Sequence, residues 1–240
     1  MNATATASDT GRLRAAAVAS ALLARVLGPD TTAMVDPETL DAIRVALEGA
    51  GAEGALARFG DGRSIDEFIE DPAELAGRWV RWFELGRVAP YEASNVLTAA
   101  GGVTPRLADV AGFYQAFGLE VVDERPDHVV AQLEFMAMAL LAEAEAFEAG
   151  DAEAAEATSR AIRSFLRDHI GGWVDAWAAR VSGVDELAPW VPAASAAAEF
   201  VRGEAARRNV IPLSEAAVLP ADAGLAYDEE ADMACEDALE

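Results

Sequence analysis

The chain has 240 residues and a formal net charge of −24 at pH 7, and all 18 of its basic residues are arginine. The absence of lysine excludes a lysine-dependent P-loop and a Schiff-base lysine, and so acidic a chain disfavours nucleic acid and anionic membranes as partners. A single cysteine, Cys235, excludes an intramolecular disulfide and a cysteine-built metal cluster, and with only two histidines we expect no metal site.

The acidic, lysine-free composition is typical of a halophilic source or a GC-rich genome, and we interpret it as adaptation rather than as a binding signal. Residues 11–28, GRLRAAAVASALLARVLG, have the outline of a signal peptide. Arg25 interrupts their apolar run, however, and their large apolar residues fall largely on one helical face. We therefore predict an amphipathic first helix, no membrane span and a cytoplasmic location.

Helix boundaries are indicated by capping residues and proline at the starts and by glycine at the stops. The predicted starts are Asp36-Pro37, Asp71-Pro72, Thr104-Pro105 and Asp151, and the predicted stops are Gly28, Gly86, Gly118 and Gly150. Residues 87–96 read as a connector that enters a short helix. Further helix is broken at residues 171–172, and the last helix is expected over 192–208.

No alternating apolar pattern is long enough to predict a sheet. We therefore expect an all-α protein with a single globular multi-helix domain over residues 10–212. Residues 1–9 are small and polar, and we expect a flexible N-terminal end. Apolar residues thin out and acids gather over residues 213–240, which predicts a flexible acidic tail.

Residues 78–96, RWVRWFELGRVAPYEASNV, carry the first group of candidate functional residues. The helical spacing of Trp79, Trp82 and Phe83 places them on one face, which predicts either a core seam or a hydrophobic groove for a peptide. Polar residues follow where a turn would present them beside the rings: Tyr91, Glu92 and Ser94. A later group is assigned to the core: Asp168, His169, Trp173 and Trp177.

Residues 124–141, ERPDHVVAQLEFMAMALL, place a proline, an acid and a histidine ahead of an apolar helix. Pro126 fits the first helical position, so Asp127 and His128 are predicted in the first turn, where the dipole favours the acid and disfavours a protonated imidazole. The stripe behind them is Val129, Leu133, Met136 and Leu140. Three roles stay open for the pair: a structural helix start, the acid–base pair of a small enzyme, or a recognition site. A structural helical adaptor would bury both side chains.

Four segments occur in the order APYEASNV, ADVAGFYQAFGLE, ERPDHVVAQLEFMAMAL and FLRDHIGGWVDAWAARV. Their order and spacing, over roughly residues 75–180, resemble the TorD/DmsD/NarJ family of redox-enzyme maturation chaperones. The proline–acid–histidine element is the most specific part. E-R-P-D-H in place of E-P-x-D-H, and Ala93 ahead of Ser94, indicate a subgroup nearer the chaperones of dimethylsulfide, selenate, chlorate or ethylbenzene enzymes.

The resemblance implies a TorD-like, cofactor-free chaperone without enzymatic activity, acting as a monomer or homodimer. Its partners would be the N-terminal twin-arginine signal peptide and the catalytic subunit of a molybdopterin oxidoreductase of the DMSO reductase family, held until cofactor is inserted. The implied peptide-binding residues are Trp79, Trp82, Phe83, Tyr91, Glu92, Ser94, Asp127 and His128. We expect the aromatic residues to bury the apolar part of the signal and the acids to attract its arginines.

Overall fold

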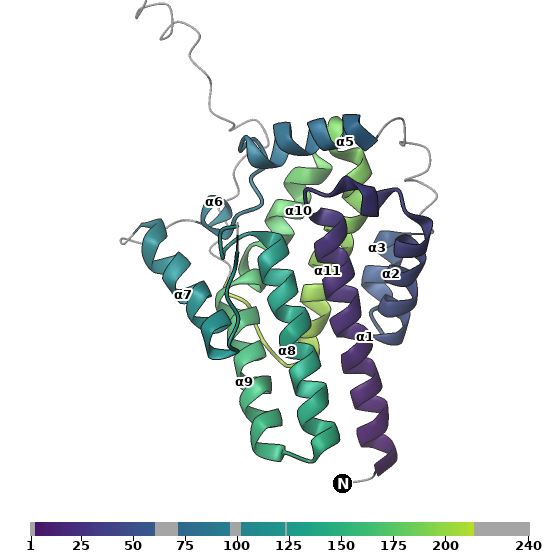
Figure 1. The fold of residues 1–240 in the computed structure, drawn as a ribbon, viewed down its shortest axis with the longest axis vertical. Coiled ribbons are helices and arrows are strands. Elements are labelled where there is room, and N and C mark those ends of the chain that lie inside the picture. Colours follow the sequence, from purple (N-terminus) through teal and green to yellow (C-terminus); the bar gives the residue numbers. More distant parts are fainter. Residues whose placement is uncertain (1–2, 61–71, 97–101, 123, 214–240) are drawn as a thin grey trace, which may run out of the picture.

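A computed structural model describes residues 3–60, 72–96, 102–122 and 124–213 (Figure 1). These residues form α-helices, short 3₁₀ helices and a π-helical turn, and over these ranges no strand is found. An isolated antiparallel bridge joins Tyr91 to His128. The prediction of an all-α fold is confirmed.

The described elements are numbered in chain order. The α-helices are α1 (Ala3–Leu27), α2 (Pro37–Gly49), α3 (Glu53–Phe59), α5 (Pro72–Trp79), α6 (Glu92–Asn95), α7 (Val103–Ala116), α8 (Val129–Ala149), α9 (Ala152–Asp168), α10 (Val174–Ser182) and α11 (Val191–Arg207). The 3₁₀ helices are η1 (Thr31–Met34), η3 (Ile170–Gly172) and η4 (Asp185–Trp190), and the π-helical turn is η2 (Val80–Glu84).

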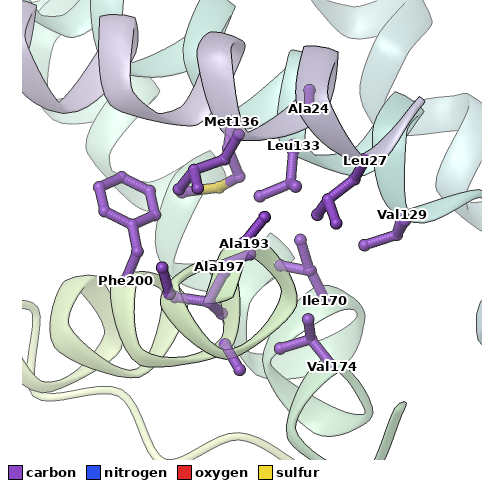
Figure 2. Close-up of a cluster of buried hydrophobic side chains, with 14 of the residues drawn as sticks. Ala24, Leu27, Val129, Leu133, Met136, Ile170, Val174, Ala193, Ala197 and Phe200 are labelled. Atoms are coloured by element: carbon purple, nitrogen blue, oxygen red, sulfur yellow. The ribbon is translucent and has the colours of Figure 1, made fainter. Parts of the chain in front are cut away.

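The core lies between three long helices, α1, α8 and α11. Helix α1 packs on α8, α2 and α11, while α11 also packs on α3 and α10, and α9 returns along α8 (Figure 1). Figure 2 shows apolar side chains of these elements converging on one another. The predicted stripe of α8 is confirmed, because all four of its side chains are fully buried: Val129, Leu133, Met136 and Leu140. Each large side chain so buried stabilises the fold by about 1.5–3 kcal/mol.

Most predicted helix boundaries are confirmed by capping contacts. The Asp36 carboxylate accepts hydrogen bonds from the Glu38 and Thr39 N–H groups, with Pro37 as the first helical residue. Gly150 ends α8 in the left-handed conformation at φ 71°, and Asp151 caps α9 by accepting from the Ala154 N–H at 2.9 Å. These signals are local, which is why the sequence alone predicts them.

Two predicted starts are wrong, by two residues for α7 and by three for α8. Helix α7 begins at Val103, ahead of the Thr104-Pro105 pair. Helix α8 begins at Val129, and His128 is its N-cap, so Asp127 and His128 precede the first turn. The reason is pairing with a distant segment: the Val129 N–H donates to the Pro90 carbonyl at 2.8 Å and the Glu92 N–H to the Asp127 carbonyl at 2.8 Å. This pairing holds His128 in an extended conformation directly after a turn at Asp127.

The predicted amphipathic first helix is confirmed by the burial of Leu13, Leu23, Val26 and Leu27. Helix α1 begins at Ala3, within the segment 1–9 that we expected to be flexible. The predicted acidic tail falls on residues 214–240, outside the described residues, and stays a prediction. Among the helices that the structure describes, none is both long and apolar enough to cross a membrane.

The predicted break at Gly171 and Gly172 is confirmed and has a steric cause. A Cβ on Gly171 would collide with the Leu166 carbonyl, and one on Gly172 would collide with the carbonyl of Leu213. Residue 213 lies there because its N–H donates to the Arg167 carbonyl at 2.8 Å. The glycine pair therefore lets the segment after α11 cross η3 at backbone contact.

Candidate functional site

Two of the three predicted groove aromatics lie in the core. Trp79 is 5% exposed and donates its indole N–H to the Leu27 carbonyl at 3.1 Å. Phe83 is 1% exposed, and its ring meets Trp79, Trp177 and Trp190 at centroid distances of 5.9, 5.9 and 5.7 Å. These contacts fit the core-seam alternative, since burial leaves the two rings little surface to offer a peptide.

Trp82 lies differently because the helix widens at η2. The Leu85 N–H donates to the Val80 carbonyl at 2.9 Å, five residues back, as in a π-helix. Trp82 is partly exposed, and the Arg87 guanidinium lies 5.6 Å from its ring centroid. Val80 and Leu85 beside it are exposed. Trp79 and Phe83 therefore share a buried face on which their rings meet, whereas Trp82 is only partly buried.

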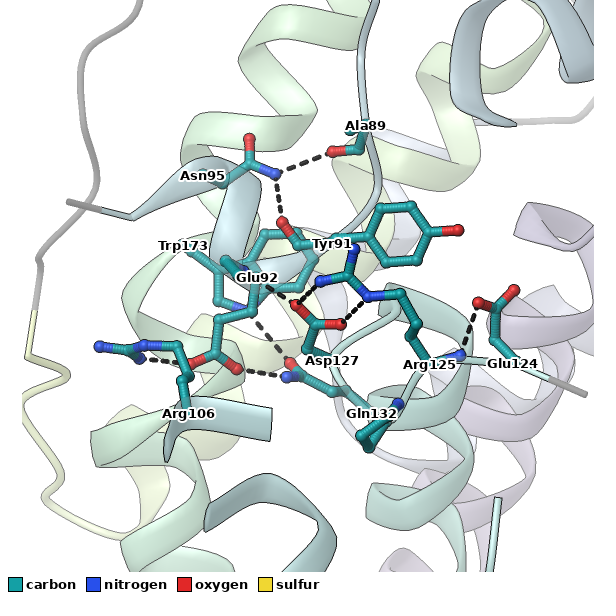
Figure 3. A network of polar contacts seen from close by, with 12 residues as sticks. Ala89, Tyr91, Glu92, Asn95, Arg106, Glu124, Arg125, Asp127, Gln132 and Trp173 are labelled. Atoms are coloured by element: carbon teal, nitrogen blue, oxygen red, sulfur yellow. Dashed lines mark hydrogen bonds and ion pairs between the residues drawn. The ribbon is translucent and has the colours of Figure 1, made fainter. Parts of the chain in front are cut away.

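Glu92 is fully buried at the centre of a polar network (Figure 3). Its carboxylate accepts hydrogen bonds from Arg106 at 2.5 Å and from the Gln132 amide, and lies 3.2 Å from Nδ1 of His169. The Trp173 indole N–H donates in turn to the Gln132 carbonyl oxygen at 3.0 Å. Because a buried carboxylate needs all such partners, this network fixes α6, α7 and α8 against the residues around η3.

Asp127 is also fully buried, beside this network. Its carboxylate accepts from Arg125 Nε at 3.0 Å and Nη2 at 2.9 Å, and from the Ala93 N–H at 3.0 Å. Burial raises the pKa of the Asp127 carboxyl above its ordinary value, although the Ala93 N–H and Arg125 act in the opposite direction. These donors thus favour the ionised carboxylate, while burial, the larger effect, favours the protonated form.

His128 caps α8 and is 1% exposed. Its Nδ1 accepts from the Val130 N–H at 3.1 Å, and the edge of the ring meets Tyr91 at a centroid distance of 5.1 Å. Nε2 lies 4.0 Å from the Glu124 carboxylate, beyond hydrogen-bond reach. The pKa of His128 is lowered to about 4, mainly by burial and also by Arg125, with Glu124 acting in the opposite direction, so the imidazole is neutral at pH 7. Nδ1 thus bonds to Val130 and not to Asp127, and Nε2 has no hydrogen-bond partner among the described residues.

Tyr91 and Ser94 bring the cluster to the surface. Tyr91 is partly exposed, and the Arg125 guanidinium carbon lies 4.3 Å from its ring centroid. Ser94 is exposed and donates its N–H to the Tyr91 carbonyl at 3.0 Å. The fold thus brings together five of the predicted residues: Tyr91, Glu92, Ser94, Asp127 and His128. The other three lie in α5 and η2: Trp79, Trp82 and Phe83.

Two adjoining surface hollows, of about 520 and 250 Å³, lie between α7, the segment after it and α8. Both are lined by Tyr114, Leu119, Glu120, Val121 and Glu124. The smaller hollow extends along α8 past Glu134 and Met138. We call the two hollows together the α7–α8 groove. Its walls are largely apolar, and its described lining residues include three glutamates and no arginine.

Sequence reasoning missed this groove and the partners of the buried acids. Gln132 carried a usable signal, because it stands on the apolar face of α8 between Val129 and Leu133, where a polar group must find a buried partner. The mixture of apolar and acidic residues after Gly118, LEVVDE over 119–124, was a second signal. Over the ranges that the structure describes, no three His, Cys, Asp or Glu side chains are grouped as a metal site.

A second buried ionic cluster lies toward the other end of α8. Arg208, whose side chain is 9% exposed, donates to the two Glu143 carboxylate oxygens at 3.1 and 2.7 Å. It lies 3.6 Å from Glu204, which also pairs with Arg12 at 2.8 Å. These contacts join α1, α8 and the end of α11 far from the groove.

Comparison with known proteins agrees with this fold. A sequence model of the family described as "Nitrate reductase delta subunit" matches residues 60–179. The selenate reductase assembly chaperone protein of Thauera selenatis is 31% identical over 134 residues, which cover 51% of this chain and 67% of that protein. No solved structure matches the chain significantly.

The matched region contains α5 to α9, and with them the Glu92 network and the α7–α8 groove. The protein is thus one of the all-helical redox-enzyme maturation chaperones. More narrowly, the chain belongs to the nitrate reductase delta subunit family, the family of NarJ- and TorD-like chaperones. The selenate reductase chaperone falls in the subgroup that the departures in the motifs indicated.

Proposed function

We propose that this protein is a cytoplasmic assembly chaperone that binds the N-terminal twin-arginine signal region of the catalytic subunit of a molybdopterin oxidoreductase. The client, of the DMSO reductase family, is held until its cofactor has been inserted and is then released for export. Membership of the family, and the name of the selenate reductase relative, support the assembly role.

The observation that carries the proposal is the α7–α8 groove. A twin-arginine signal offers two guanidinium groups followed by an apolar stretch. The groove offers apolar walls together with the carboxylates of Glu120, Glu124 and Glu134. Carboxylates bind guanidinium groups through two parallel hydrogen bonds, and the apolar walls can cover the rest of the signal. In strong salt these short contacts matter more than the long-range attraction of the acidic chain.

The buried members of the predicted site have a supporting role in this proposal. Glu92 and Asp127 hold the segments 90–95 and 124–128 in place, and these segments present Tyr91 and Glu124 at the surface. Trp79 and Phe83 stabilise the end of the helix bundle that carries these two segments. The contacts that we assign to the peptide come from the groove, with Tyr91, Trp82 and Ser94 as the exposed residues of the original set.

The enzyme alternative finds less support. An acid–base pair requires the carboxylate to orient the imidazole. Here the Asp127 carboxylate bonds to Arg125 and Ala93, while His128 caps α8 through Nδ1. The two side chains share a neighbourhood without a hydrogen bond between them.

The direct test is a calorimetric titration of the protein with a synthetic twin-arginine leader peptide. We expect saturable binding that weakens when both peptide arginines are replaced by glutamine. The Glu120→Gln/Glu124→Gln variant should lose about tenfold or more in affinity, at about 1 kcal/mol for each charge-assisted contact. Glu153→Gln, on the exposed start of α9, is the matched control and should bind normally. Equal affinity of the three proteins would contradict the assignment of the groove.

A second test addresses the client. The protein, used as bait in lysate of its source organism at native salt, should enrich the catalytic subunit of a molybdopterin oxidoreductase. Recovery without any such subunit would refute the assembly role.

A further inference from the structure

Arg125 is held in an arrangement that proteins use to bind a foreign arginine. Its guanidinium makes two parallel hydrogen bonds to the Asp127 carboxylate, at 3.0 and 2.9 Å. One face of the same group lies 4.3 Å from the Tyr91 ring centroid. Figure 3 shows the guanidinium between this ring and the carboxylate. A fork-like ion pair together with an aromatic face is the geometry that favours guanidinium over ammonium.

The two partners differ sharply in exposure. The Asp127 side chain is fully buried, whereas 42% of the Arg125 side chain is exposed. Arg125 stands only two residues before Asp127, so its side chain can rotate into solvent without moving a helix. The carboxylate and the ring belong to the framework of the site, while the arginine is its removable part.

The site adjoins the α7–α8 groove. Glu124 and Pro126, the chain neighbours of Arg125, both line the larger hollow. Glu124 also accepts a hydrogen bond from the Arg125 backbone N–H at 2.7 Å. A peptide lying in the groove would therefore contact the two chain neighbours of Arg125, although Arg125 itself lines neither hollow.

We propose that Asp127 and Tyr91 form a guanidinium-binding subsite for one arginine of the client signal, and that Arg125 fills this subsite until the client arginine displaces it. This inference rests on the proposed function for the identity of the client. Displacement should be one for one, because leaving the Asp127 carboxylate without a cation costs about 1 kcal/mol even where water can reach it. Arg125 thereby discriminates against peptides without arginine, since they can reach the site only by leaving Asp127 unpaired.

The subsite can be tested without any peptide. The Arg125→Ala variant should bind N-ethylguanidinium, which replaces the missing group, and its melting temperature should rise saturably at millimolar ligand. Ethylammonium, a point charge without the fork, should have a smaller effect. The matched control is Arg14→Ala, which removes an exposed two-bond pair with Glu148 far from the site. Neither this control nor the wild type should respond to the ligand.

The double variant Arg125→Ala/Asp127→Asn guards against misfolding. It removes both charges, and it should fold and ignore N-ethylguanidinium. If Arg125→Ala folds only when N-ethylguanidinium is present, the subsite is supported. If it stays unfolded with the ligand while the double variant folds, or folds and responds no more than wild type, the subsite is refuted.

The competition is tested with the twin-arginine leader. The Arg125→Ala variant should bind it about fivefold more tightly than wild type, because the client no longer has to break a half-exposed ion pair. Unchanged or weaker binding would refute displacement. If N-ethylguanidinium binds the variant but the leader binds neither protein, the subsite stands and the proposed function fails.

Discussion

Each end of α8 has a buried carboxylate paired with an arginine, and the two pairs differ in how exposed the arginine is. At the start of α8, Asp127 is buried against Arg125, and near its other end Glu143 is buried against Arg208. Both arginines make two hydrogen bonds to their acid. The side chain of Arg208 is 9% exposed and that of Arg125 is 42% exposed. A buried acid can therefore have a permanent partner or a replaceable one, and exposure of the arginine distinguishes the two.

Their surroundings differ in the same direction. Arg208 comes from the end of α11 and also faces Glu204, so its position is fixed by three helices. Arg125 comes from the segment that leads into α8, next to the groove. The Arg208 cluster is therefore expected to serve stability, and the Arg125–Asp127 pair to serve binding.

The largest effect is expected for Arg208→Ala. Removing this guanidinium leaves Glu143 buried without its main partner, which typically costs about 3–5 kcal/mol. Unfolding by urea should show the loss as a lower midpoint. A decrease in the free energy of unfolding of less than about 1 kcal/mol would mean that Arg208 is as replaceable as Arg125.

Acidic pH should weaken the cluster at the start of α8. The pKa of His128 is about 4 in the folded protein and 6.5 in the unfolded chain, so the unfolded state binds an extra proton between these values. The stability that His128 contributes is complete above pH 6.5 and falls as the pH drops to about 4, by about 3 kcal/mol.

His128→Asn keeps an N-cap acceptor but removes the titration. Free energies of unfolding measured from pH 7 to pH 4 should therefore fall less steeply for this variant. Parallel curves for the two proteins would contradict a neutral, buried His128. Asp127 titrates in both proteins, so the difference between the curves isolates the histidine.

A smaller effect is expected for Arg125→Ala, at about 1 kcal/mol, because the pair is half exposed and water can reach Asp127 once the arginine is gone. Urea unfolding beside Arg208→Ala gives the comparison directly. Equal losses for the two variants would remove the distinction between a permanent and a replaceable partner.

The smallest effect is expected for Ser94→Ala. Ser94 is exposed, and its backbone N–H, which the substitution retains, makes its hydrogen bond to Tyr91. The free energy of unfolding should change by less than about 0.5 kcal/mol. Any change in affinity for the leader peptide would then report a contact with the peptide, and a loss of stability above this limit would show a structural role.

The sequence predicted what depends on local chemistry. Asp36, Gly150 and Asp151 bound their helices through contacts within a few residues, and apolar spacing identified the buried face of α8. The start of α8 was misplaced because residues 127–129 pair with residues 90–92, nearly 40 positions earlier in the chain. Pairing at that separation leaves no periodic trace.

The site was predicted in composition but not in exposure. The resemblance to the chaperone family identified Tyr91, Glu92, Asp127 and His128 as a set, but it could not say that three of them are buried. The role of Arg125 was missed because its partner is two residues away, a separation that helical reasoning ignores. The groove needs α7, α8 and the segment between them, so it exists only once these have packed.

The wide turn at η2 has a consequence for chain length. Each residue of an α-helix turns its successor by about 100° around the axis. Deleting one residue from 80–84 would convert the π-helical turn into an ordinary α-helical turn. The deletion would also rotate the Phe83 ring away from Trp79 or from Trp190. The number of residues between these rings is thus as strict a requirement as their aromatic character.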